Sequence, residues 1–257
     1  MLNYEELENL ARLKRLSLVN IEKDYLQELI LLSIYSIVSK GLVFKGGTCL
    51  YKIYKLNRFS EDLDFSLTEK LDIKKLANKI ASDLELLNIK CRIKEIKEYK
   101  NEINIRLLLN GPLYKGSRET QCFIPLNISR KEQIILEPKR ESIISLYKEI
   151  PNFELFSMQE KEILAEKVRA VFTRQKPRDI YDLWFLIVNK KIAPDKNLIN
   201  KKLALYNTEF NFKEFTRKIE IMRNLWQIDL KNLIIGELQE FDKVKKELYK
   251  KFKSAEI

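Results

Sequence analysis

The 257-residue sequence contains no histidine. Histidine is the common general base near neutral pH and a frequent zinc ligand. Its absence excludes Ser-His-Asp triads and histidine-ligated zinc sites. Any catalysis must therefore depend on carboxylates, lysine, arginine, hydroxyl groups or the backbone.

Cysteine is also scarce. The three cysteines, Cys49, Cys91 and Cys122, are widely spaced and form no C-x-x-C pair, so we expect reduced, buried thiols of a cytosolic protein. The longest apolar run, residues 29–38, is interrupted by two serines, and the first residues lack a basic-then-apolar pattern. We expect no secretion signal, no transmembrane span and a cytoplasmic location.

Charge is plentiful and unbalanced. The chain has 48 basic and 37 acidic residues, a net charge of +11 and 45% hydrophobic residues, which predicts a globular protein. The excess of positive charge favours a polyanionic partner such as RNA, DNA or a nucleotide, although many lysine-rich proteins bind no nucleic acid. Lys139-Arg140 and the lysine-rich segment 243–253 are candidate RNA contacts, and a solvated helix face is the stronger interpretation of the latter.

Glycine is rare, yet two of the six glycines are adjacent, at Gly46-Gly47. Backbone N–H groups approach a ligand closely where Cβ is missing, so this turn is a candidate phosphate loop. The segment 58–66 then alternates with period two and places Asp62 and Asp64 on one strand face, roughly 7 Å apart. Such a pair can hold Mg²⁺ while a nucleoside triphosphate completes the ligands. A solvated strand after an ordinary turn is the alternative.

A second group of charged residues lies in the C-terminal half. Lys167 and Arg174 are seven residues apart on an expected helix, so both face the same side and can neutralise one phosphate chain. After Pro177, Asp179 and Asp182 share a face of the next helix. An ordinary surface ion pair and favourable charges in a first helical turn are the alternative.

The periodicity predicts a mixed α/β (α+β) fold of two domains. The Gly-Gly turn, the short amphipathic segment after it and the Asp-x-Asp strand resemble the layout of the nucleotidyltransferase fold, so residues 1–150 are expected to form a domain of that kind around a small mixed sheet. Residues 151–257 are expected to form a helical domain that closes over the active site. The expected helices are 4–16, 21–40 (capped by Asn20), 47–56, 72–88, 159–175, 178–188, 197–205, 211–226 and 230–253. The expected strands are 59–66, 91–109 and 120–128, with a further β-like piece at 133–136.

Four motifs occur in order between about residues 40 and 190: Phe44-Lys45-Gly46-Gly47-Thr48-x-Leu50, Arg58-Phe59-Ser60-x-Asp62-Leu63-Asp64-Phe65, Ala165-Glu166-Lys167-x-Arg169-Ala170 with Arg174, and Arg178-Asp179-x-Tyr181-Asp182-Leu183. Together they resemble the AbiEii/AbiGii toxin family of nucleotidyltransferases from abortive-infection and toxin–antitoxin systems. The resemblance implies transfer of a nucleotide from an NTP to an acceptor, which in studied members is the tRNA 3′ end. It also implies Mg²⁺ or Mn²⁺ as cofactor and a cognate antitoxin as partner.

The resemblance also assigns roles to residues. Those expected to be catalytic are Asp62, Asp64, Lys167 and Asp179, of which Asp62 and Asp64 bind the metal. Those expected to bind the nucleotide are Lys45, Gly46, Gly47, Thr48, Ser60, Arg174, Arg178 and Asp182.

One position departs from the pattern. Related polymerase-like enzymes bring a third carboxylate from a neighbouring strand, where this chain has Asn127. Asparagine can ligate Mg²⁺ through its carbonyl oxygen but cannot act as a base, so either Asp179 supplies the third carboxylate or transfer is weak or absent. The alternatives to nucleotidyl transfer are a phosphotransferase acting on a protein or small molecule, a nucleic-acid-binding module without activity, and a helical protein that sequesters a partner.

Overall fold

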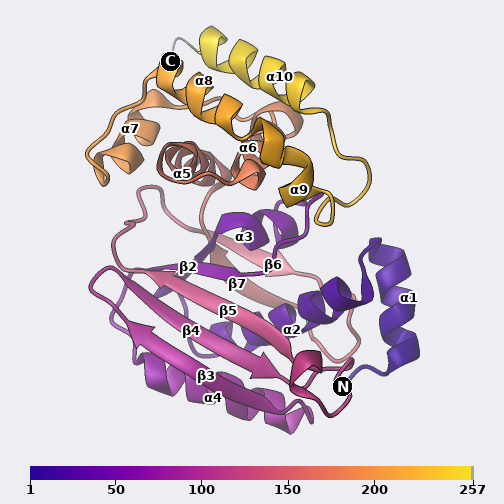
Figure 1. Cartoon of the computed structure of the whole chain (residues 1–257). Coiled ribbons are helices and arrows are strands. Elements are labelled where there is room, and N and C mark those ends of the chain that lie inside the picture. The colour runs from indigo at the N-terminus through magenta and orange to yellow at the C-terminus, as the bar shows by residue number, and fades with distance from the viewer. Residues whose placement is uncertain (256–257) are drawn as a thin grey trace. The chain divides into compact units, whose positions relative to one another are not determined.

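The computed structural model describes residues 1–255, which divide into two compact units (Figure 1). The first unit comprises Met1–Ile53, Phe59–Ile134 and Pro138–Ser157. The second contains the rest, including two short segments, Tyr54–Arg58 and Ile135–Glu137, that leave the first unit and return to it. The expected domain boundary near residue 150 stays a prediction.

The first unit is built on one seven-stranded mixed sheet, with the order β3-β4-β5-β2-β1-β7-β6. Two neighbouring pairs, β2 with β5 and β1 with β7, are parallel, and the other pairs are antiparallel. The strands are β1 Leu42–Lys45, β2 Leu63–Leu67, β3 Cys91–Glu98, β4 Glu102–Leu109, β5 Cys122–Ser129, β6 Lys139–Ile143 and β7 Phe153–Ser157.

The helices of the first unit are α1 Tyr4–Lys14, α2 Leu18–Tyr35, α3 Gly46–Lys52 and α4 Ile73–Leu86. α1 packs on α2, and α3 contacts β1 and β2. Figure 1 shows α4 behind β3 and β4, and α4 contacts β3 while α2 contacts β5. The apolar residues that alternate along β4, Ile103, Ile105 and Leu107, are completely buried. The period-two pattern therefore marks the core face of the sheet.

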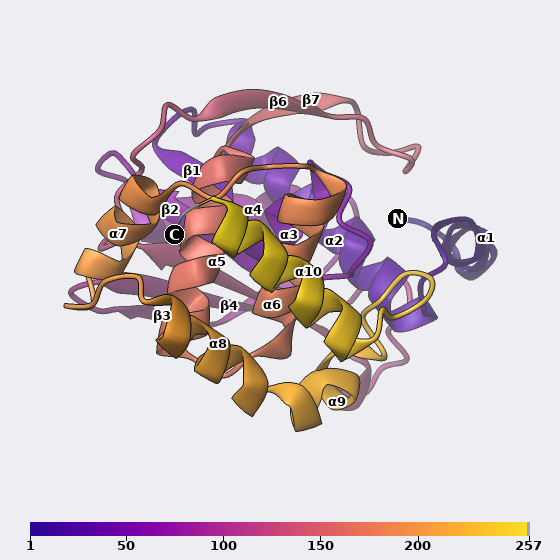
Figure 2. The same cartoon turned by 90° about the horizontal axis from the view of Figure 1, so that it is seen from above.

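The second unit is helical. Its helices are α5 Glu160–Thr173, α6 Pro177–Trp184, a π-helical continuation Phe185–Asn189, α7 Lys196–Ala204, α8 Phe212–Ile221, α9 Trp226–Leu230 and α10 Phe241–Ser254. α5 packs on α6 and α7, and α10 crosses α6 in the view of Figure 2. Four aromatic rings, Phe172, Phe210, Phe215 and Phe252, pack together in its core. None of the helices formed by residues 1–255 is long and apolar enough to span a membrane.

The structure confirms the predicted fold class and corrects several elements. Segment 133–136 is not a strand, whereas β1, β6 and β7, each of four or five residues, were missed. The expected helix 230–253 is helical only from Phe241, because α9 ends at Leu230 and the segment that follows is irregular, with Gly236 at a φ of +103°. α2 begins after Ser17, whose hydroxyl accepts a hydrogen bond from the Asn20 N–H, so Asn20 lies inside the helix instead of capping it.

Candidate active site

The Gly-Gly turn and the second aspartate lie against each other in the first unit. Gly46 has a φ of +74°, and a Cβ added to it would lie 2.6 Å from Asp64 Oδ2. Antiparallel pairing of β1 and β2 produces this proximity, because it places Lys45 opposite Asp64. Glycine is thus needed at position 46 both for the backbone conformation and for the space that the carboxylate fills.

The backbone of the segment before β2 is held by side chains from two helices. Thr48, completely buried in α3, donates its hydroxyl hydrogen bond to the carbonyl oxygen of Asp62. Gln27 of α2, also completely buried, donates from Nε2 to the carbonyl oxygens of Ser60 (3.0 Å) and Glu61 (2.9 Å). Thr48 was expected to bind the nucleotide, and in the structure its side chain positions the backbone at Asp62. The role of Gln27 was not predicted, because an amide within an apolar helical pattern does not indicate to which group it donates.

The expected strand 59–66 begins only at Leu63, so the prediction that Ser60 and Asp62 share a strand face with Asp64 is wrong. Ser60 and Asp62 lie in irregular chain, and Arg58 belongs to the second unit. Asp62 and Asp64 are both partly exposed, as ligand-binding carboxylates need to be.

Asn127 occupies the place of the expected third acid and contacts Asp64 directly. Its Nδ2 donates to Asp64 Oδ1 at 2.9 Å, and its Oδ1 accepts from Arg106 Nη1 at 2.9 Å. The register of the sheet explains this, because Asn127 is opposite Asp64 on β2 and opposite Asn104 on β4. In this arrangement the amide carbonyl faces the guanidinium group of Arg106, and Asn127 orients the Asp64 carboxylate.

Lys45 is buried at the end of β1, where its ammonium group forms an ion pair with Glu132. Ser66 donates a hydrogen bond to the carbonyl oxygen of Glu132 at 3.0 Å, which fixes that segment against β2. Glu132 was not anticipated from the sequence, because the 87 positions that separate it from Lys45 give no local pattern.

In the second unit, four of the predicted residues form a ladder of alternating charge with Arg58. We call Arg58, Asp182, Lys167, Asp179 and Arg174 the charge ladder. Lys167 Nζ lies 2.8 Å from Asp179 Oδ1 and 2.6 Å from Asp182 Oδ2. α5 carries the lysine and α6 carries both aspartates, so the spacings noted in the sequence do place these groups together.

The two ends of the charge ladder differ in exposure. At one end Arg58 is buried and donates from Nε and Nη2 to the two oxygens of Asp182, each at 2.9 Å. At the other end Arg174 donates to both oxygens of Asp179, at 2.7 and 2.9 Å, while half of its side-chain surface stays exposed. Arg174 is therefore the end of the ladder that presents positive charge to solvent.

The ladder keeps its aspartates ionised. Burial would raise the pKa of Asp179, but the charge of Lys167 and the hydrogen bonds from Arg174 hold that pKa well below its usual range. Burial likewise opposes ionisation of Asp182, and Arg58 and Lys167 lower its pKa. Both oxygens of Asp179 accept hydrogen bonds from cations, which suits a residue that positions Lys167 and Arg174 better than a metal ligand.

Arg178 is the remaining predicted residue. Its backbone N–H donates to Asp229 Oδ2 at 3.2 Å, which joins the start of α6 to α9. Its predicted role in binding nucleotide stays a prediction.

Asp62 and Asp64 carry carboxylate oxygens, which are suitable ligands for a hard cation such as Mg²⁺. In the part of the chain that the structure describes, no group of three or more His, Cys, Asp or Glu residues gathers around one point. A pair of carboxylates still fits Mg²⁺, which typically takes one or two carboxylates together with water and substrate phosphates. The absence of a Cβ at Gly46 lets the Asp64 carboxylate lie directly beside the start of α3.

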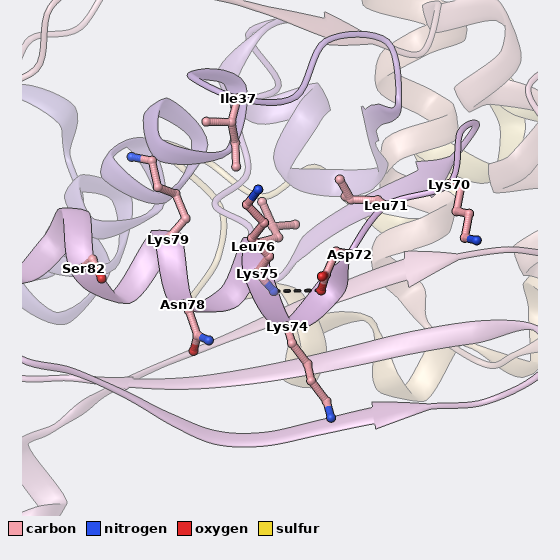
Figure 3. Close-up of a pocket in the computed structure, with 10 residues that line it drawn as sticks. All are labelled: Ile37, Lys70, Leu71, Asp72, Lys74, Lys75, Leu76, Asn78, Lys79 and Ser82. Atoms are coloured by element: carbon pink, nitrogen blue, oxygen red, sulfur yellow. Dashed lines mark hydrogen bonds between the residues drawn. The ribbon is translucent and has the colours of Figure 1, made fainter.

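A hollow in the first unit lies apart from these residues (Figure 3). It has a volume of about 970 Å³, and Lys70, Lys74, Lys75 and Lys79 lie around it at the start of α4. This hollow follows the end of β2, whereas Asp64 is near the beginning of that strand. It contains none of the predicted site residues.

Comparison with protein families decides the assignment. A family model described as "Nucleotidyl transferase AbiEii toxin, Type IV TA system" matches residues 30–255. The chain belongs to this AbiEii family. It is therefore a nucleotidyltransferase toxin, and membership of a type IV toxin–antitoxin family implies an NTP substrate and an antitoxin partner.

Solved structures show the same fold as this AbiEii-family chain. The MenT4 nucleotidyltransferase toxin from Mycobacterium tuberculosis aligns with a TM-score of 0.71 at 17% identity and covers 100% of this chain and 90% of its own. JHP933 from Helicobacter pylori aligns with a TM-score of 0.63 at 20% identity, over 93% of each chain. A search of functionally curated proteins finds no match.

Proposed function

We propose that this AbiEii-family enzyme transfers a nucleotide from an NTP to the 3′ end of an RNA, with tRNA as the acceptor and Mg²⁺ as the cofactor. The observation that carries the proposal is the contact of Gly46 with the carboxylate of Asp64. It joins a turn suited to phosphate with an acid suited to a metal ion. An NTP presents both kinds of group, and we place the reaction in the cytoplasm, where NTPs and tRNA are found.

In the proposed reaction, the acceptor hydroxyl oxygen forms a bond to the α-phosphorus of the NTP. The bond from that phosphorus to the bridging oxygen breaks, pyrophosphate leaves with the electron pair, and the hydroxyl proton passes to solvent. Gly46, Gly47 and Ser60 contact the triphosphate, and Asp62 and Asp64 hold Mg²⁺. When bound, Mg²⁺ supplies positive charge to the phosphates and lowers the pKa of the acceptor hydroxyl.

The charge ladder supplies fixed positive charge in this proposal. Lys167 and Arg174 stabilise the charge that develops on pyrophosphate. Asp179 and Asp182 hold the two cations in place, so their contribution to the rate is indirect. Lys45 and Thr48 likewise act by positioning β1 and the chain at Asp62.

The surface charge supports a polyanionic acceptor. The net charge is +11, and on α10 Lys246, Lys250 and Lys251 are exposed. Exposed lysines attract the phosphate backbone in a salt-dependent manner. This favours an RNA acceptor over an uncharged small molecule.

The test is incubation of the enzyme with total tRNA, Mg²⁺ and each NTP, labelled with ³²P either at the α- or at the γ-phosphate. We expect RNA labelled from the α-phosphate only, and loss of at least 100-fold of this labelling in Asp62→Ala and Asp64→Ala, the range typical of removing a charge-stabilising group. Glu61→Gln is the matched control, because Glu61 directly precedes Asp62 yet its side chain pairs with Lys23 at the surface.

Each other result has a distinct meaning. Label from the γ-phosphate on protein or a small molecule would identify a phosphotransferase instead. Unlabelled RNA with every NTP, or equal labelling by Asp64→Ala, would refute the proposed reaction.

A further inference from the structure

The three strands β3, β4 and β5 have one face that the helices of the first unit leave open. On their core face every β4 and β5 apolar residue is buried, whereas Arg92, Lys94 and Phe123 on the other side are exposed. We call this second side the outer face. Its charged residues are Arg92, Lys94, Lys97, Arg106, Glu95 and Glu102, four basic and two acidic.

Phe123 is the unusual residue of the outer face. It lies on an inner strand of the sheet, yet 39% of its surface is exposed. The ammonium group of Lys94 lies 5.5 Å from the centre of its ring. Single-stranded nucleic acids stack their bases on exposed aromatic rings and place their phosphates near cations. An exposed ring on a strand next to a cation offers both contacts.

Arg106 lies between Phe123 and Asn127 on the outer face, because it is opposite Pro125 of β5. Its guanidinium group donates to Asn127 Oδ1 of β5 at 2.9 Å and to Asn104 Oδ1 of β4 at 3.2 Å, so it bridges the two strands. Asn127 in turn donates to Asp64. Phe123 and Asn127 are four residues apart on β5, about 13 Å by the rise of a strand. The outer face therefore runs directly from Asp64 to Phe123 within one unit.

We propose that the outer face binds the single-stranded 3′ end of the acceptor RNA, with a base stacked on Phe123 and phosphates held by Lys94 and Arg92. This inference rests on the proposed function, and it assigns the acceptor to a particular surface. An acidic protein segment would match the charge as well, but it would give no use to an exposed ring beside a cation. A single strand uses both features.

The test measures binding without NTP or metal, so that it does not depend on catalysis. Fluorescence anisotropy with a labelled single-stranded RNA of about ten nucleotides gives the Kd at several salt concentrations. We expect Phe123→Ala to raise the Kd about fivefold or more, from the loss of one stacked base, and Phe123→Trp to preserve it. Lys94→Ala is expected to reduce the salt slope by about 0.7.

Lys75→Ala is the matched control, since Lys75 is an exposed lysine on α4, at the hollow of Figure 3. We expect it to change neither the Kd nor the salt slope as much as Lys94→Ala. Circular dichroism of each variant checks that the fold is retained. An unchanged Kd in folded Phe123→Ala, or equal effects of Lys75→Ala and Lys94→Ala, would overturn the inference.

Two further results separate the possible failures. If α-labelled RNA forms normally with Phe123→Ala, nucleotidyl transfer stands and the outer face is not the acceptor site. If a poly-glutamate peptide binds as tightly as RNA and Phe123→Ala weakens both equally, the outer face is a protein-binding surface and our assignment fails. A blunt RNA duplex that binds as tightly as the single strand would also contradict it, because paired bases cannot stack on the ring.

Discussion

Removal of the Asp182 carboxylate tests whether the charge ladder holds the second unit together. Asp182 is completely buried and receives both bonds of the Arg58 fork, at 2.9 Å each, as well as the ammonium group of Lys167. Asp182→Ala leaves a guanidinium group inside the protein without its bidentate acceptor. We expect severe destabilisation, because removal of one partner of a buried ion pair leaves the other charge buried with nothing to compensate for its lost hydration.

The magnitude follows from burial. Only 2% of the Arg58 side-chain surface is exposed, so water cannot replace the lost carboxylate. Losses at such sites are about 3–5 kcal/mol. At about 2–4 °C per kcal/mol for a chain of this size, the melting temperature should fall by about 6–20 °C. Urea denaturation followed by circular dichroism gives the free energy of unfolding directly.

The double variant Arg58→Met/Asp182→Leu separates charge from packing. Apolar residues of similar size often replace a buried ion pair without loss, so this variant should recover most of the stability. Asp64→Ala serves as the control, since it removes one hydrogen bond from a partly exposed carboxylate and should cost less than about 1.5 kcal/mol. A melting temperature of Asp182→Ala within about 2 °C of the wild type would refute the structural role of the ladder.

Three other changes probe the first unit. Gly46→Ala should abolish α-phosphate labelling of RNA, because its Cβ would meet the Asp64 carboxylate at 2.6 Å; wild-type activity of the variant would contradict the placement of that turn. Gln27→Glu keeps the shape of the side chain but removes the Nε2 donor to the carbonyl oxygen of Ser60. We therefore expect kcat to fall about tenfold with little change in KM, whereas an equal fall in kcat and KM would indicate a different role. For Asp24, burial opposes ionisation, but Lys52 and Lys14 lower the pKa to about 2. Since the unfolded pKa is near 4, this group should contribute about 2.6 kcal/mol of stability at pH 5 and above, and this contribution decreases as the pH falls toward 2. Urea titrations should show about half of this loss between pH 5 and pH 3 in the wild type and a smaller loss in Asp24→Asn.

The sequence predicted the structure correctly where a single local pattern determines the position of a side chain. Alternation along 103–109 marked the core face of β4. Lys167 lies on α5 as expected, whereas Arg174 lies just after the end of α5 in extended backbone, and both contact Asp179. Four-residue strands such as β1 are too short for periodicity to reveal, and their pairing is set by distant partners. The contact between Gly46 and Asp64 was suggested by motif order, but its closeness depends on the register of β1 against β2.

Arg58 shows a different limit. It stands two residues before Ser60 in a segment that alternates in the sequence, so periodicity assigns it to the strand that carries Asp64. The chain instead places Arg58 in the second unit, opposite Asp182, which is 124 positions away. A buried arginine needs a carboxylate, and that requirement outweighs a weak local preference for a strand.

Asn127 is the position at which sequence and structure together say more than either alone. The sequence shows only that an acid is missing, which suggests a weakened metal site. The structure shows that the amide accepts from Arg106 and donates to Asp64, two groups of opposite charge with opposite hydrogen-bonding needs. An aspartate there could accept from Arg106 but, when ionised, could not donate to Asp64 and would repel it. Asn127→Asp should therefore disturb the orientation of Asp64, and a rise in nucleotidyl transfer by this variant would contradict the positioning role of the amide.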